Sequence, residues 1–123
     1  MTARKKILVV DDDEAVTTYL QAKIGTTYDV VTTNLSTQAL ALAKSERPDL
    51  VICDIDMPQL DGGDLAAKLA GDPATRDIQI LFLTGLLSPD EAESVGGEVS
   101  GRPAIAKRAP FPVLMGRIRQ LIG

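Results

Sequence analysis

The chain has 123 residues, which is the size of one domain and leaves no room for a multidomain enzyme. Hydrophobic residues make up 45% and charged residues 24%, the balance of a globular rather than a disordered protein. The net charge of −4 gives no support to general nucleic-acid binding. With no histidine and a single cysteine, the chain cannot form an internal disulfide, a His or Cys metal cluster, or a histidine-activated nucleophile.

No apolar run approaches the ~20 residues that a membrane span needs. The apolar run over residues 7–10 is also too short for the core of a signal peptide. We therefore expect a soluble protein of the reducing cytoplasm, in which the lone Cys53 is a small core residue.

The first part of the chain predicts two strands that alternate with two helices. Residues 7–10 form a continuous apolar run, typical of a strand buried on both faces. Residues 14–24 have apolar side chains at helical spacing, and residues 28–33 are rich in residues that favour strands. Ser36 is placed to cap a second helix, which Pro48 would end.

The rest of the chain continues this alternation. Residues 50–53 and 78–83 predict buried strands, and residues 64–69 between them predict a short helix. Residues 88–91, Ser-Pro-Asp-Glu, have the pattern of a helix start. The elements expected after that are a glycine-rich loop over residues 95–103, a strand over 104–106 and a helix over 113–122.

Five strands alternating with helices predict an α/β fold: a doubly wound five-stranded parallel sheet with helices on both faces, (βα)5. In such sheets the functional crevice lies beyond the carboxyl ends of the strands. Polar residues of particular kinds follow four of the predicted strands: Asp11 and Asp12, then Asp54, then Thr84, then Lys107. Ordinary surface loops would be polar without placing acids, a hydroxyl and a cation at successive strand ends.

The acids predict a metal site. Asp11, Asp12 and Asp54 would converge if the first and third strands are neighbours, and their like charges would then repel. An oxygen-only donor set of this kind suits Mg²⁺. The alternative is that the acids after the first strand only cap the next helix, where negative charge is favoured. That alternative explains Asp13 and Glu14 but not the acids after the third strand, so we favour Mg²⁺.

With Thr84 and Lys107 added, the site predicts a receptacle for a phosphoryl group. Asp54 would be the nucleophile, since an aspartyl carboxylate can accept a phosphoryl group covalently. Taken singly, Thr84 could be a strand-end hydroxyl that bonds locally and Lys107 a solvated surface lysine. Their combination with the acids at four strand ends favours the phosphoryl site.

Four segments carry a resemblance to a known family: residues 6–14 (KILVVDDDE), residues 48–63 (PDLVICDIDMPQLDGG), residues 80–85 (ILFLTG) and Lys107. In this order they resemble the CheY-like receiver domain of two-component response regulators, along nearly the whole chain. The resemblance implies that residues 1–123 form a single receiver domain of flavodoxin-like fold with no output domain. The chain would be either a free-standing regulator or part of a longer protein.

The resemblance also implies a role for each matching residue. Asp54 would accept a phosphoryl group from the phosphohistidine of a partner, either a histidine kinase or a phosphotransfer protein. Thr84 would move to that phosphoryl group and Lys107 would pair with it. The groups implied to hold Mg²⁺ are the carboxylates of Asp11, Asp12 and Asp54 and the backbone carbonyl of Asp56.

A receiver of this kind would phosphorylate and dephosphorylate itself, so we do not expect an enzyme that turns over a separate substrate. Phosphorylation would switch a surface that binds a downstream protein effector or, in a homodimer, a second copy of the chain. We expect no direct contact of this chain with nucleic acid and none with a membrane.

Three features depart from the family's pattern. Arg108 follows the lysine where the family commonly has a proline with a cis bond, and a cis bond before another residue costs about 3 kcal/mol. Ala104 occupies the place of the family's rotating aromatic residue, and the glycine- and serine-rich residues 94–102 indicate a short or mobile fourth helix. Asp56 and Leu86 lie where the family tunes dephosphorylation, and we hypothesise that Asp56 hinders the attacking water.

Two other functions fit part of the pattern. Residues 54–57 (DIDM) resemble the nucleophile motif of haloacid-dehalogenase-like phosphatases, although that motif usually follows the first strand. A non-phosphorylated pseudo-receiver that only binds a partner fits the departures at Ala104 and Arg108 but not the intact acids. A dinucleotide-binding domain is disfavoured, because acids occupy the place of its glycine-rich phosphate loop.

Overall fold

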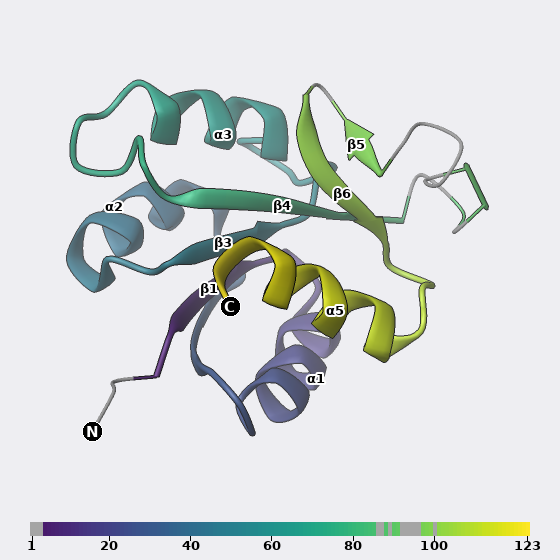
Figure 1. The fold of residues 1–123 in the computed structure, drawn as a ribbon. Helices are drawn as coiled ribbons and strands as arrows, with labels where there is room; N and C mark the ends of the chain where they lie inside the picture. Colours follow the sequence, from purple (N-terminus) through teal and green to yellow (C-terminus); the bar gives the residue numbers. More distant parts are fainter. Residues whose placement is uncertain (1–3, 86–87, 89, 92–96, 100) are drawn as a thin grey trace.

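The computed structural model describes residues 4–85, 88, 90–91, 97–99 and 101–123, and Figure 1 shows their arrangement. Six strands form one sheet in the order β2-β1-β3-β4-β6-β5. The strands are β1 (Lys6–Val10), β2 (Asp29–Thr33), β3 (Leu50–Cys53), β4 (Gln79–Thr84), β5 (Glu98–Val99) and β6 (Arg102–Ala106). The helices with described bounds are α1 (Glu14–Ile24), α2 (Ser36–Glu46), α3 (Gly62–Ala70) and α5 (Phe111–Ile122).

Five of the strands pair in parallel, which confirms the predicted doubly wound fold. The sixth strand, β5, was not predicted, and it pairs antiparallel with β6 at the edge of the sheet. Positive φ angles at Gly97 and Gly101, 70° and 77°, frame this two-residue strand. The predicted loop over residues 95–103 is therefore wrong at β5 and at the first two residues of β6. A strand as short as β5, set among glycines, carries no alternation of polar and apolar residues that would predict it.

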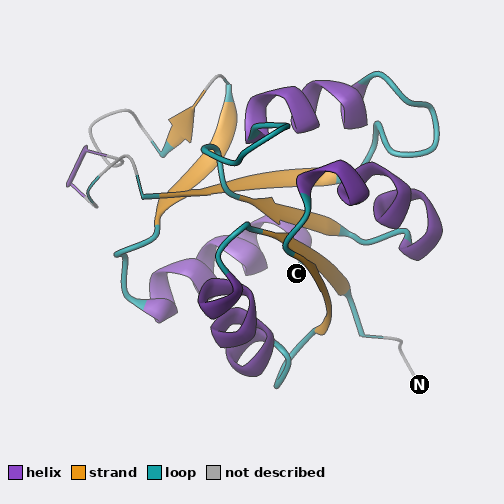
Figure 2. Cartoon of the chain, turned by 180° about the vertical axis from the view of Figure 1, so that it is seen from behind, coloured by secondary structure: helices purple, strands orange, loops and turns teal. Residues whose placement is uncertain are grey.

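Helices cover both faces of the sheet. Helices α2 and α3 cover one face of the sheet and α1 and α5 the other. Figure 1 shows α3 above the strands with α1 and α5 below, and Figure 2 shows the molecule from behind. Alternate residues of β1 face opposite layers: Ile7 and Val9 pack toward α1 and α5, whereas Leu8 and Val10 pack toward α2 and α3. All four are at most 1% exposed, and burying each contributes roughly 1.5–3 kcal/mol.

The first two helices begin differently. At α1 the Asp13 carboxylate accepts a hydrogen bond from the Ala15 backbone N–H at 3.0 Å, which confirms its capping role. The prediction that Ser36 caps α2 is wrong, because Leu35 is the capping residue and makes no side-chain bond. The Ser36 hydroxyl instead donates to the Pro58 carbonyl at 3.1 Å.

The predicted helix start after β4 is confirmed at its described residues. The Glu91 backbone N–H donates to Ser88 Oγ at 3.2 Å, and the Ser88 N–H donates to Glu91 Oε1 at 3.1 Å. This reciprocal pair is a capping box. The predicted role of Leu86 and the length of the fourth helix lie outside the described residues.

Two helices start earlier than predicted. Helix α3 begins at Gly62 because the Asp61 side chain caps it, accepting from the Asp64 N–H at 2.8 Å. Helix α5 begins at Phe111 with a proline in its first turn, where a missing N–H costs nothing. Both starts contain residues that also favour loops, which is why the predicted bounds were too short.

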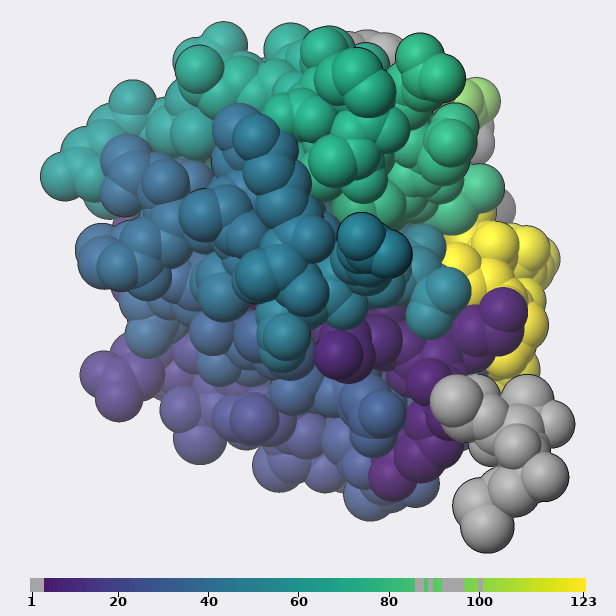
Figure 3. Space-filling model, turned by 90° about the vertical axis from the view of Figure 1, so that its left-hand side faces the viewer, coloured from purple at the N-terminus to yellow at the C-terminus, as the bar shows by residue number. Residues whose placement is uncertain are grey.

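The first and last parts of the described chain lie side by side on one face of the molecule (Figure 3, purple and yellow). The Tyr28 hydroxyl donates to the Gly123 carbonyl at 3.4 Å, and Arg4 Nη2 donates to the Tyr28 carbonyl at 2.9 Å.

Within the described residues, every helix is too short or too polar to cross a membrane.

Candidate functional site

The sheet brings Asp11 and Asp54 to the same level. Strands β1 and β3 are parallel neighbours with Val10 opposite Cys53, so the next residue of each strand lies at the same edge. The Asp54 N–H donates to the Val10 carbonyl at 3.1 Å, and the Asp11 N–H donates to the Thr33 carbonyl at 3.2 Å. The predicted neighbourhood of these two strand ends is therefore confirmed.

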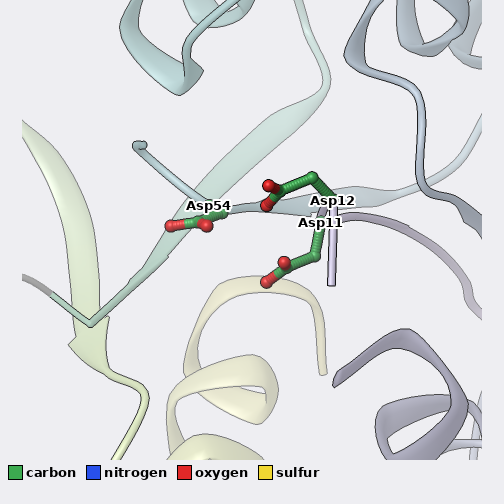
Figure 4. Close-up of side chains that lie close together, drawn as sticks. All are labelled: Asp11, Asp12 and Asp54. Atoms are coloured by element: carbon green, nitrogen blue, oxygen red, sulfur yellow. The ribbon is translucent and has the colours of Figure 1, made fainter. Parts of the chain in front are cut away.

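Three carboxylates gather at this edge (Figure 4). One oxygen from each of Asp11, Asp12 and Asp54 lies within 4.8 Å of the others. Asp11 and Asp54 are buried, with 1% and 6% exposure, whereas Asp12 is exposed. The cluster therefore has two enclosed members and one that faces solvent.

Lys107 is the cation of the cluster. It follows β6, where its backbone N–H donates to the Thr84 carbonyl at 2.7 Å. Its Nζ lies 2.8 Å from Asp11 Oδ2 and 3.1 Å from Asp54 Oδ2. Burial alone would lower the pKa of Lys107, but its bonds to these two carboxylates outweigh burial and leave its pKa raised.

Asp11 is the most deeply buried carboxylate of the cluster, and burial changes its pKa. Its Oδ1 accepts a hydrogen bond from the Asp13 N–H at 2.9 Å. Its Oδ2 is buried and pairs with the Lys107 ammonium at 2.8 Å. Burial raises the pKa of Asp11, and it outweighs the opposing effect of Lys107 and of the Asp13 N–H.

This donor set fits Mg²⁺. The ion takes oxygen ligands at ~2.0–2.1 Å, which puts opposite ligands about 4 Å apart, close to the spread of the three carboxylates. A carboxylate oxygen has two lone pairs, so Asp11 Oδ2 can bind a cation as well as Lys107. The exposed Asp12 leaves room for bound water. The residues that could hold the ion are Asp11, Asp12 and Asp54.

The remaining predicted residues lie at the same edge. Thr84 ends β4, is fully buried, and is paired in register with Ala106, directly before Lys107. The Asp56 N–H donates to Asp54 Oδ1 at 3.4 Å, while the Asp56 side chain is exposed. No peptide bond among the described residues is cis, so the Lys107–Arg108 bond is trans.

One residue at the site was not predicted. Asn34, in the loop between β2 and α2, donates from Nδ2 to the Asp11 carbonyl at 2.9 Å. An asparagine in a loop is common and carries no signal of its own in a sequence. Only the pairing of β1 with β2 brings Asn34 to Asp11.

A groove of about 400 Å³ adjoins the cluster between α1 and α5. Its walls are mainly apolar, and Lys107 is among its lining residues. The larger apolar side chains that line it are Val16, Tyr19, Leu20, Leu83, Phe111 and Leu114. A partner seated in this groove would therefore lie next to the acidic site.

Known proteins with similar sequences include response regulators. A family model described as the response regulator receiver domain matches residues 7–119. The response regulator PleD of Caulobacter vibrioides is 37% identical over 123 residues, which cover 98% of this chain and 26% of PleD. This chain thus spans about a quarter of the length of that relative.

Two solved structures show the same fold. The BeF3-activated N-terminal receiver domain of Klebsiella pneumoniae RstA is 33% identical with a TM-score of 0.80, over 96% of this chain and 98% of that one. The Vibrio cholerae chemotaxis protein CheY4 is 24% identical with a TM-score of 0.81, over 97% and 99%. With the family match over residues 7–119, these likenesses confirm the resemblance: the chain belongs to the receiver domain family of two-component response regulators.

Proposed function

We propose that Asp54 is the phosphoacceptor of this receiver domain and that its phosphorylation depends on Mg²⁺. The observation that carries the proposal is the position of Asp54. It is buried at a strand end, shares the Lys107 ammonium with Asp11, and lies within the three-carboxylate cluster. A lone buried carboxylate would have no such set of charges around it.

In the proposed step an Asp54 carboxylate oxygen attacks the phosphorus of a phosphohistidine on a partner protein. The P–N bond breaks as the new P–O bond forms, and the electron pair stays on the imidazole nitrogen, which takes a proton from solvent. When bound, Mg²⁺ would offset the negative charge of the carboxylates and of the phosphoryl oxygens. Lys107, already 3.1 Å from Asp54 Oδ2, supplies a second positive charge within reach of those oxygens.

Thr84 is the proposed switch residue. It ends the strand next to β3 and is fully buried, so its movement would change the packing around it. We propose that its hydroxyl donates to a phosphoryl oxygen and that this movement carries phosphorylation from the site to a partner-binding surface. Hydrolysis of the acyl phosphate would reset the domain without turnover of a separate substrate.

The proposed partners follow from this chemistry. The donor is a histidine kinase or a phosphotransfer protein, since the chain itself contains no histidine. The groove beside Lys107 offers apolar surface where such a donor could approach Asp54. A downstream protein effector would read the switched surface, and we propose the cytoplasm as the place where the exchange occurs.

The test is incubation with acetyl phosphate and Mg²⁺, followed by intact mass spectrometry. We expect one phosphoryl adduct per chain, lost in Asp54→Asn and in the presence of EDTA. The matched control is Asp77→Asn, which changes an exposed acid in the loop before β4 and should keep the adduct. No adduct with any donor would favour the pseudo-receiver, and continuous release of phosphate from a phosphomonoester would favour the phosphatase.

A further inference from the structure

We propose that Asn34 is a positioning residue for the metal site: it holds the turn that carries Asp11 and Asp12 in a geometry ready for Mg²⁺. The inference rests on the proposed function, since it concerns how the Mg²⁺ ligands are held. Asn34 brings no charge to the site, and its loop between β2 and α2 supplies none of the three clustered carboxylates.

The contacts of Asn34 join two parts of the acid-bearing segment. Its Nδ2 donates to the Asp11 carbonyl at 2.9 Å and to Thr17 Oγ1 at 3.0 Å. Thr17 is 3% exposed and lies in the first turns of α1, where its hydroxyl donates to the Glu14 carbonyl at 3.1 Å. One amide group therefore brackets residues 11–17, the stretch that contains Asp12.

The end of β2 fixes Asp11 a second time. The Asp11 N–H donates to the Thr33 carbonyl at 3.2 Å, and Thr33 directly precedes Asn34. The Asp11 N–H thus bonds to Thr33 at the end of β2, and the Asp11 carbonyl bonds to Asn34 in the loop that follows. With its backbone held on both sides, the Asp11 carboxylate has only its own side-chain torsions left to move.

Such a restraint matters because the ligands repel one another. Three carboxylates lie within 4.8 Å, and Lys107 brings one positive charge against their three negative ones, so the remaining repulsion favours an open turn when no metal lies between them. The amide of Asn34 opposes that opening with neutral donors, so its effect does not depend on the charges of the acids. An ion that binds a turn already held in place loses less free energy to ordering the turn.

The first residue of α2, directly after this loop, reaches the segment that follows Asp54. Ser36, 4% exposed, donates from Oγ to the Pro58 carbonyl at 3.1 Å. Pro58 lies four residues beyond Asp54 in the connection from β3 to α3. Through Asn34 in the β2–α2 loop and Ser36 at the start of α2, this part of the chain links the two connections that carry the ligands. Ser36 is a second, weaker anchor.

The test compares Mg²⁺ affinity with stability measured without metal. Mg²⁺ is titrated into ¹⁵N-labelled protein while the amide signals of Asp12 and Asp13 are followed, and melting is recorded separately in EDTA. We expect Asn34→Ala to raise the Mg²⁺ dissociation constant about tenfold. Asn34→Leu should raise it to a similar extent, because the side chain keeps about the same size and stays neutral but loses both donors.

Ser36→Ala should raise the dissociation constant about threefold, in keeping with its more distant anchor. The matched control is Ser45→Ala. The Ser45 hydroxyl, like that of Ser36, donates to a backbone carbonyl, but its acceptor is Leu42 of the same helix, at 3.3 Å, and not a residue of the site. This control should bind Mg²⁺ as the wild type does. The amide spectrum of each variant shows whether it is folded before any affinity is compared.

The outcomes separate this inference from the proposed function. A wild type that binds no Mg²⁺, or an Asp12→Asn variant that binds it equally well, overturns the metal site and the inference with it. If Asp12→Asn loses the ion but both Asn34 variants bind within twofold of the wild type, only the positioning role is wrong. If the Asn34 variants melt at a lower temperature than the wild type in EDTA but bind Mg²⁺ with the same dissociation constant, the role of Asn34 is purely structural.

Discussion

The Asp54 carboxylate stands between opposing charges. Lys107 Nζ lies 3.1 Å from its Oδ2, and the Asp56 N–H lies 3.4 Å from its Oδ1. The like charges of Asp11 and Asp12, in the same cluster, repel the Asp54 carboxylate. A nucleophile in this setting is held in position by its donors and gains from any cation that enters the cluster.

Cys53 directly precedes Asp54, but its side chain is a neutral thiol in the core rather than a charged nucleophile. Its side chain is fully buried, and burial, followed by the charges of Asp54 and Asp11, raises the pKa of its thiol to about 12. Against an ordinary value of 9.0, this lowers the thiolate fraction about a thousandfold in mildly alkaline buffer. We predict that a thiol reagent such as DTNB leaves native Cys53 unmodified and labels it fully in concentrated guanidinium chloride. Rapid labelling of the native chain would contradict the burial.

The exposed Asp56 carboxylate bears on how long a phosphoryl group would survive. Its backbone N–H donates to Asp54 Oδ1 and its side chain is exposed, so we hypothesise that its charge hinders a water that approaches Asp54. We predict that Asp56→Asn shortens the lifetime of the phosphorylated domain about fivefold, which corresponds to about 1 kcal/mol of charge repulsion in water. The decay is followed by intact mass after removal of the phosphodonor, with Asp77→Asn as the control. An unchanged decay rate would end the hypothesis.

At the scale of elements, the start of α3 depends on a close backbone approach. The Gly62 N–H donates to the Ile55 carbonyl at 2.8 Å, which presses α3 against the connection after β3. A Cβ on Gly62 would lie 2.4 Å from the Asp54 carbonyl oxygen and 2.9 Å from Ile55 Cα. Both neighbours are backbone atoms, so the chain would have to shift to make room.

We predict that Gly62→Ala lowers the free energy of unfolding by about 1–3 kcal/mol, as an overpacked site does. The adjacent Gly63→Ala is the matched control, because its Cβ would meet only Asp61 Oδ1, at 3.4 Å. That substitution should be neutral or stabilising by up to about 1 kcal/mol through helix propensity. Urea denaturation measures both, and equal effects of the two substitutions would refute the close-approach argument.

The elements also show what a sequence can specify. Helix α1 has its predicted bounds because Asp13 caps one end and Gly25 follows the other. The acids Asp11 and Asp54 could be predicted as neighbours, since the apolar runs before them mark strands buried in one sheet. The same reasoning failed for β5, which is too short to show a pattern.

Ser36 shows a different limit. A serine before an apolar stripe predicts a cap, but here the helix starts one residue earlier and the hydroxyl bonds to Pro58, 22 residues away. The contact of Asn34 with Asp11 spans 23 residues and depends on which strands pair. Contacts of this range follow from tertiary structure, and local patterns cannot reveal them.

At the scale of the whole molecule, the site joins the ends of β1, β3, β4 and β6, so its charge acts on the stability of the entire fold. We predict that Mg²⁺ stabilises the domain, by about 2.7 kcal/mol at a concentration one hundred times its dissociation constant. Melting in MgCl₂ is compared with melting in KCl at equal ionic strength, which controls for screening. Asp12→Asn should lose the gain, and a gain that persists in this variant would place the ion elsewhere.

The central claim is that the phosphoryl group is carried by Asp54 and by no other acid of the cluster. The most direct measurement is to treat the chain with acetyl phosphate and Mg²⁺, reduce it with borohydride, and sequence its peptides by mass spectrometry. Borohydride converts an aspartyl phosphate to homoserine, which marks the residue that carried the group. We predict homoserine at position 54 alone; homoserine at position 11, 12 or 56, or at no position, would contradict the account.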